Sequence, residues 1–129
     1  MNVWYGSGEN ARFSNLAHRP FTVNGRDYVS VEHAYQTLKG GVFDADTHAR
    51  YKRAGVKIVG RMKPKTDGNW NIELMRKLIL ISFRQNPTER DALVATGDEV
   101  ITHRQDRGVW RTEFPRLLML VRAQLAGSE

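Results

Sequence analysis

The strongest pattern in the sequence is an apolar stripe between residues 70 and 83. Met75, Leu78, Ile79 and Phe83 recur at the spacing that brings side chains onto one face of a helix. The pattern predicts a helix over residues 70–83 at the centre of the core. The other elements must then cover its apolar face.

A short β region precedes this helix. Residues 21–23 and 27–29 flank Asn24-Gly25, a pair suited to the positive φ angles of a tight hairpin turn. Residues 3–5 and 100–102 are two further strand candidates. We therefore expect a small antiparallel sheet.

Capping residues indicate where the other helices begin and end. Ser30 can cap a helix over residues 31–39, which Gly40-Gly41 can end, and this puts Glu32 in the first turn. Three more helices are predicted. One covers roughly residues 46–54 and stops at Gly55, and a short one is opened by Asn86-Pro87 and closed before Gly97. The last helix follows a loop over residues 103–111, and its apolar face carries Leu117, Leu118, Val121 and Leu125.

Helices without a regular strand–helix alternation argue against a doubly wound sheet. We expect an α+β fold, in which a helix-rich single domain packs on a small antiparallel β-sheet. A length of 129 residues is close to the commonest domain size, so we expect one domain over residues 1–129.

The charge balance favours an anionic partner. Lys and Arg total 20 against 14 Asp and Glu, a net charge of +6. Phosphates on a nucleotide, a dinucleotide or a nucleic acid would suit this charge, although a basic surface kept for solubility is the alternative. The most basic segment, residues 56–65, carries Lys57, Arg61, Lys63 and Lys65.

Several classes of site are excluded or not indicated. The chain has no cysteine, which excludes disulfides, thiolate metal sites and a cysteine nucleophile, and suits a reducing cytoplasm. Its start does not resemble a signal peptide, and no stretch approaches the roughly 20 apolar residues of a membrane span, so we expect a cytoplasmic protein without membrane contact. Phosphate-binding loops, metal-ligand histidine pairs and a serine nucleophile elbow are also missing, and we expect no metal and no cofactor.

The remaining carboxylates, aromatic rings and cations are what hydrolysis of an N-glycoside requires. Breaking the bond between ribose C1 and a base nitrogen builds positive charge on the sugar, which a nearby carboxylate stabilises. Glu32 meets this need, because a carboxylate at the positive end of a helix dipole is expected to stay ionised. On spacing alone, a surface acid that only complements the dipole is the favoured interpretation of Glu32, and a catalytic role is the alternative.

The order of motifs resembles the NADAR (NAD and ADP-ribose associated) superfamily along nearly the whole chain. Its most distinctive string is Ser-x-Glu-His-x-x-Gln-x-x-Lys, here residues 30–39. The matching positions before and after it are Trp4-Tyr5, Phe13-Ser14-Asn15-Leu16, Pro20-Phe21, Gly60-Arg61, Trp70, Phe83-Arg84-Gln85-Asn86-Pro87, Thr96-Gly97-Asp98, Asp106 and Trp110.

The resemblance implies an N-glycosidase. Some members split ribosylamino-pyrimidine phosphates of early riboflavin synthesis, and others remove ADP-ribose from guanine in nucleic acid. By matched position, the resemblance implies Glu32 as the catalytic carboxylate, Asp106 as a second acid near the sugar, Trp70 for stacking on the base, and Asn15, Lys39 and Arg61 for polar or phosphate contacts. Trp110 is a further substrate-binding candidate that could equally pack in the core.

One segment departs from the family pattern. Where members usually have a glycine-rich loop with an asparagine after the late tryptophan, this chain continues directly through residues 111–117. Arg107, Arg111 and Arg116 beside this segment suggest an open, cationic mouth suited to a large substrate such as nucleic acid carrying ADP-ribosylated guanine. The alternatives are a non-catalytic ADP-ribose or NAD-binding module and a plain nucleic-acid-binding protein; the oligomeric state stays open.

Overall fold

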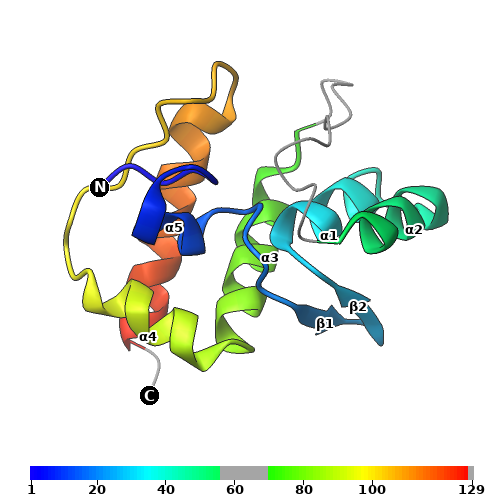
Figure 1. Ribbon diagram of the computed structural model, residues 1–129, viewed down its shortest axis with the longest axis horizontal. Coiled ribbons are helices and arrows are strands. Elements are labelled where there is room, and N and C mark those ends of the chain that lie inside the picture. Colours follow the sequence, from blue (N-terminus) through cyan, green and yellow to red (C-terminus); the bar gives the residue numbers. More distant parts are fainter. Residues whose placement is uncertain (56–69, 128–129) are drawn as a thin grey trace.

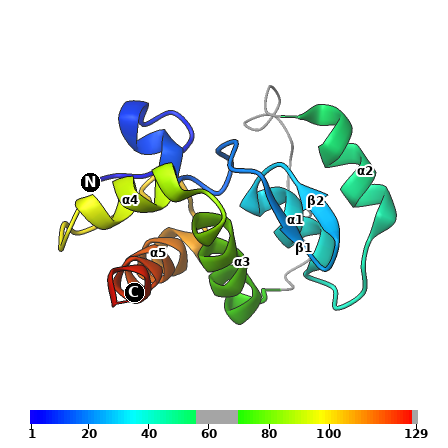
Figure 2. The same cartoon turned by 90° about the horizontal axis from the view of Figure 1, so that it is seen from below.

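Helix α3 (Ile72–Arg84) runs through the middle of the molecule, with the other elements on its two sides (Figure 1). This computed structural model describes residues 1–55 and 70–127. One side of α3 holds helices α1 (Val31–Leu38) and α2 (Ala45–Ala54) with strands β1 (Phe21–Val23) and β2 (Arg26–Tyr28). The other side, also distinct in the view from below (Figure 2), holds the 3-10 helix η1 (Gly8–Phe13), α4 (Pro87–Ala95) and α5 (Trp110–Gly127).

The apolar stripe of α3 is buried, as its spacing predicts. Met75, Leu78, Ile79 and Phe83 are each at most 2 % exposed and belong to the hydrophobic core. The predicted start at Trp70 is wrong by two residues. Asn71 accepts a hydrogen bond from the Leu74 backbone nitrogen through its side chain, 3.1 Å away, and this cap fixes the first helical residue at Ile72.

The predicted hairpin is confirmed. Strand β1 pairs antiparallel with β2, with Phe21 opposite Tyr28. Asn24 and Gly25 form the turn with φ angles of 51° and 76°, the left-handed region that this pair tolerates. Phe21 and Tyr28 are buried, so the sheet contributes one face to the core beside α1.

The strands predicted at residues 3–5 and 100–102 are wrong. In their place, an isolated parallel bridge joins Asn2 to Thr102. The chain turns soon after Asn2. The backbone nitrogen and the hydroxyl of Ser7 both donate to the Trp4 carbonyl oxygen, at 3.1 and 2.7 Å. A strand cannot continue through this turn.

The predicted helices are present as α1, α2, α4 and α5. Helix α5 begins at Trp110, one residue before the predicted end of the preceding loop, and includes Pro115. The architecture is the predicted α+β class, helix-rich with a small antiparallel sheet. Within the described part of the chain, no helix has both the length and the apolar character needed to cross a membrane.

Candidate functional site

Glu32 is held at the start of α1 by backbone and capping contacts. Its backbone nitrogen donates to the carbonyl oxygen of Asn15 at 3.0 Å. One residue further on, the His33 nitrogen donates to the Ser30 hydroxyl at 3.1 Å, which completes the predicted cap. The segment around Asn15 and the first turn of α1 therefore position Glu32 together.

The Glu32 carboxylate is partly buried and hydrogen-bonded. The side-chain nitrogen of Gln36 donates to its Oε1 atom at 2.7 Å from one helical turn away. Desolvation raises the pKa of Glu32, and the negative charge of Asp106 adds to this rise. The hydrogen bond from Gln36 and the positive charge of Lys39 act in the opposite direction.

The helix-dipole argument alone therefore gives the wrong direction for the pKa of Glu32. A dipole favours the ionised form and lowers the pKa, whereas loss of hydration dominates here and raises it. A carboxylate with a raised pKa is a stronger base when it is ionised. This is a property that proton-transfer catalysis uses.

Two of the predicted polar residues lie close to Glu32. Lys39 is buried at the end of α1, where its charge acts on the carboxylate. The side-chain nitrogen of Asn15 lies 3.3 Å from the sulfur of Met75, and its buried Oδ1 atom has no hydrogen-bond partner among the described residues. Asn15 thus keeps unused hydrogen-bonding capacity next to the catalytic candidate.

Asp106 lies in the loop before α5, close enough for its charge to act on Glu32. Its Oδ1 atom accepts a hydrogen bond from the Gly108 backbone nitrogen at 3.0 Å, and its Oδ2 atom lies 3.6 Å from Nε2 of His103. Because Nδ1 of His103 faces the carbonyl oxygen of Val3 at 2.7 Å, Nδ1 carries the proton and donates it. These contacts fix the loop that brings the second acid to the site.

Three aromatic rings continue from α1 to the surface. The ring of Tyr35 is edge-to-face with Trp110 at 5.4 Å, and Trp110 is edge-to-face with Trp70 at 6.0 Å. The Tyr35 hydroxyl also accepts a hydrogen bond from the Asn71 backbone nitrogen at 2.9 Å. Trp70 is 48 % exposed, so a large part of its ring is accessible to a ligand.

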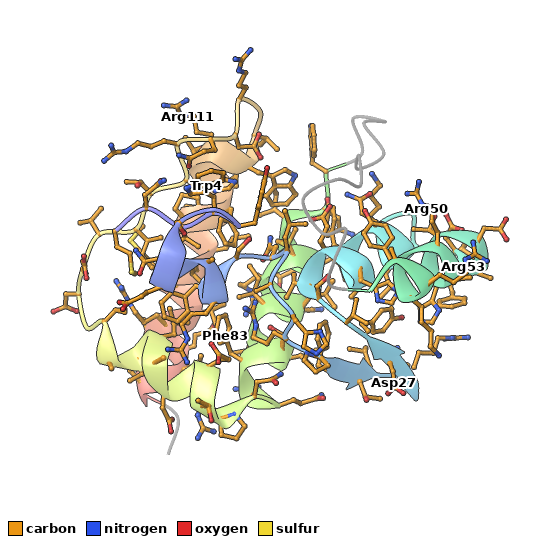
Figure 3. All side chains as sticks on the ribbon, viewed as in Figure 1. Trp4, Asp27, Arg50, Arg53, Phe83 and Arg111 are labelled. Atoms are coloured by element: carbon orange, nitrogen blue, oxygen red, sulfur yellow. The ribbon has the colours of Figure 1, made fainter. Side chains whose placement is uncertain are left out.

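The cationic residues divide into different environments. Arg61, with the basic segment around it, lies outside the described residues. Arg107 and Arg111 are exposed and form no ion pair in the described part of the chain; Figure 3 shows Arg111 near the start of α5. Arg116 is paired with Glu113 at 2.6 Å, so its expected contribution to a cationic mouth is largely neutralised.

His33 belongs to an aromatic cluster with Tyr28, His48 and Tyr51. Its Nδ1 atom accepts a hydrogen bond from the Val29 nitrogen, and its Nε2 atom donates to the His48 carbonyl oxygen, both at 3.0 Å. Burial, followed by the charge of His48, lowers the pKa of His33 to about 4. His33 is therefore neutral and fully bonded, and it does not share the face of Glu32.

Two side chains that the sequence did not single out for chemistry lie beside Glu32. Gln36 could have been found from its position four residues after Glu32, a spacing that places two side chains on the same face of a helix. Tyr51, on α2, interacts with the charge of Glu32 but has no local sequence signal. Among the described residues, no group of three or more potential ligands could hold a metal ion.

Comparison with known proteins gives a consistent set of relatives. No family model matches the chain. It is 28 % identical to N-glycosidase YbiA of Shigella flexneri, over 98 % of this chain and 88 % of the relative. It is 27 % identical, with the same coverage, to N-glycosidase YbiA of Escherichia coli K12. The solved NMR structure of the E. coli protein YbiA superposes with a TM-score of 0.73 at 26 % identity, covering 98 % of this chain and 84 % of that one.

Proposed function

We propose that this chain, which belongs to the NADAR superfamily and is an N-glycosidase, hydrolyses the bond between a phosphorylated ribose and a base, with Glu32 as the catalytic carboxylate. The sugar belongs to ribose 5-phosphate or to ADP-ribose. The observation that supports this most is the environment of Glu32. It is a partly buried acid whose pKa is raised by desolvation, held by Gln36, with a cation and a second acid nearby.

In the proposed reaction, ionised Glu32 stabilises the positive charge that develops on the sugar and accepts a proton from the attacking water. The water oxygen bonds to C1, and the C1–N bond breaks with its electron pair going to the base. The base leaves with a proton, which protonated Glu32 can return through solvent. Asp106 adds a second negative charge that favours the cationic transition state.

Trp70 and Trp110 are the groups we propose for the base. A purine or pyrimidine ring can stack on the exposed part of Trp70, while Trp110 supports Trp70 from the side. Lys39 and Arg61 are proposed for the phosphates and Asn15 for polar contacts of the sugar. Arg107 and Arg111 favour ADP-ribosylated guanine in nucleic acid over a small ribosylamino-pyrimidine phosphate, because they add exposed positive charge beside the loop that carries Asp106.

The proposed function is tested by incubating the protein with two probes, an oligonucleotide carrying ADP-ribosylated guanine and a ribosylamino-pyrimidine 5′-phosphate. The expected products are free base with ADP-ribose or ribose 5-phosphate. Glu32→Gln should abolish turnover and leave substrate affinity within about tenfold, a loss of at most about 1.4 kcal/mol, because the substitution removes charge and keeps shape.

Asp46→Asn is the matched control, since Asp46 holds the same first-turn position of α2 but is exposed. Its activity should equal that of the wild type. Tight binding of ADP-ribose without any product would instead assign the pocket to a non-catalytic binding module. Salt-sensitive binding of unmodified DNA, with no preference for ADP-ribose, would favour a plain nucleic-acid-binding protein.

A further inference from the structure

Buried polar atoms without a hydrogen-bond partner are concentrated around Glu32. Among the described residues, four side-chain atoms are of this kind: Asn15 Oδ1, Arg19 Nη2, Gln36 Oε1 and Tyr51 OH. Three of the four belong to residues that bond to Glu32 or interact with its charge. Such atoms destabilise a fold, and two of them, on Gln36 and Tyr51, belong to side chains that interact with the Glu32 carboxylate itself, which makes them candidates for bonding to a ligand.

The ring of Tyr51 is fixed by packing. It stacks on His33 with 5.6 Å between ring centroids and 9° between the planes. His33 is in turn held by hydrogen bonds at both ring nitrogens. Tyr51 is only 4 % exposed, so neither the ring nor its hydroxyl can turn freely into solvent.

The hydroxyl of Tyr51 lies within the electric field of Glu32. Desolvation raises the pKa of Tyr51, and the charge of Glu32 raises it further, so the hydroxyl keeps its proton. It is therefore a hydrogen-bond donor that has no acceptor within the described part of the protein. A donor in this place is suited to an oxygen of the substrate.

The side-chain oxygen of Gln36 is the complementary group. Its nitrogen is committed to Glu32, which fixes the amide orientation because a carboxylate can only accept. The Gln36 oxygen is consequently an acceptor to which none of the described residues donates. A sugar hydroxyl needs one donor and one acceptor, and Tyr51 and Gln36 each offer one of these two beside Glu32.

We infer that Tyr51 and Gln36 bind the 2-hydroxyl of the reacting sugar, with the Tyr51 hydroxyl donating to its oxygen and the Gln36 side-chain oxygen accepting its proton. The inference rests on the proposed function and names the two groups that make the enzyme prefer ribosides to 2-deoxyribosides. Hydrogen bonds to a 2-hydroxyl strengthen in the transition state of glycoside hydrolysis, because that hydroxyl lies next to the developing positive charge.

The test combines removal of the hydroxyl from the enzyme with removal of the hydroxyl from the sugar. Wild type and Tyr51→Phe are assayed on both proposed probes, each made with ribose and with 2-deoxyribose at the bond to be cleaved. On ribosides, Tyr51→Phe should lose about 10- to 100-fold in kcat/KM. On 2-deoxyribosides it should lose less than about threefold, since the partner of the missing hydroxyl is already absent.

A stability measurement accompanies the kinetics. Tyr51→Phe keeps the stacking on His33 and removes a buried hydroxyl that has no partner among the described residues, so its melting temperature should equal or exceed that of the wild type. Tyr28→Phe is the matched control. Tyr28 is buried in the same aromatic cluster, 5.0 Å from His33, but Arg26 and not Glu32 acts on its hydroxyl.

The outcomes separate the inference from the proposed function. The inference is overturned if the wild type cleaves ribosides but Tyr51→Phe loses no kcat/KM, or loses it equally on ribosides and 2-deoxyribosides. Either result leaves the proposed role of Glu32 as the catalytic carboxylate intact. The inference is also overturned if Tyr28→Phe changes the preference for ribosides over 2-deoxyribosides as much as Tyr51→Phe does. The effect would then come from the aromatic cluster around His33 and not from the Tyr51 hydroxyl. A wild type that cleaves neither probe overturns the proposed function and the inference with it.

Discussion

Gln36 holds the carboxylate of Glu32 from one turn further along α1, with 2.7 Å between the donating nitrogen and the accepting oxygen. This bond stabilises the ionised acid and so opposes the desolvation that raises the pKa of Glu32. Gln36→Leu should therefore raise that pKa further. Because a carboxylate accepts a proton only when it is ionised, the proposed role of Glu32 as a base predicts that the acid limb of the pH–rate profile moves to higher pH. An unchanged limb would show that Glu32 does not control the rate.

Asp106→Asn should move the same limb in the opposite direction. The negative charge of Asp106 raises the pKa of Glu32, so its removal lowers that pKa and extends activity to lower pH. The maximal kcat should nevertheless fall at least about tenfold, because the variant lacks the charge that we propose to stabilise the cationic sugar. Asp98→Asn, in an exposed loop before the bridge to Asn2, is the control and should change neither quantity.

Trp70→Ala should weaken substrate binding by about 10- to 100-fold, the usual loss when a stacked base loses its ring. Since Trp70 is 48 % exposed, the free energy of unfolding should change little. Trp70→Phe should recover most of the affinity. If the alanine variant loses stability in step with affinity, the ring serves packing against Trp110 and not stacking on a base.

His33 should make the fold sensitive to acid. The ordinary pKa of 6.5 applies to the unfolded chain, whereas burial lowers the pKa to about 4 in the folded protein. As pH falls, the unfolded state therefore binds the proton before the folded state does. The contribution of neutral His33 to the free energy of unfolding is complete above pH 6.5 and is lost progressively as pH falls to 4. The loss totals about 3 kcal/mol.

Urea unfolding at a series of pH values between 7.5 and 4 measures this dependence. His33→Gln is less stable overall but should show a flatter pH dependence, because it removes the titrating group. His18→Gln, at an exposed position, should keep the wild-type slope. A wild-type slope in His33→Gln would assign the acid sensitivity to other groups.

Arg107 and Arg111 should matter for nucleic-acid substrates and not for small ones. Reversing both charges to Glu should weaken cleavage of an ADP-ribosylated oligonucleotide. It should also reduce the salt dependence of binding, by about 0.9 in log–log slope for each phosphate that the variant no longer neutralises. Lys77→Glu with Arg84→Glu changes the net charge equally on exposed positions of α3 and is the control. Equal effects of the two pairs would indicate only general attraction.

Local signals in the sequence predicted the local structure well. The turn at Asn24-Gly25 and the cap at Ser30 were predictable because each depends on contacts within a few residues. The strand at residues 3–5 was wrong, since a strand needs a distant partner and the Ser7 contacts to Trp4 end the extension first. The start of α3 was missed because Asn71 caps the helix after Trp70.

The candidate site was predictable in part. The spacing of Glu32 and Gln36 along one helix was readable, whereas the hydration that Glu32 loses depends on the packing of the whole molecule. Tyr51 had no signal, because α2 reaches Glu32 only through its tertiary packing against α1. The roles of Asn15, Lys39, Arg61, Trp70, Asp106 and Trp110 remain predictions from matched positions.

Tyr35 joins three helices at one point. It belongs to α1, its hydroxyl accepts the Asn71 nitrogen at the start of α3, and its ring contacts Trp110 at the start of α5. The first turns of helices are where thermal fraying begins. Fraying at the start of α3 or of α5 would release the ring of Tyr35, which lies three residues after Glu32 in α1. On warming, this protein should therefore lose activity before it loses its helical content.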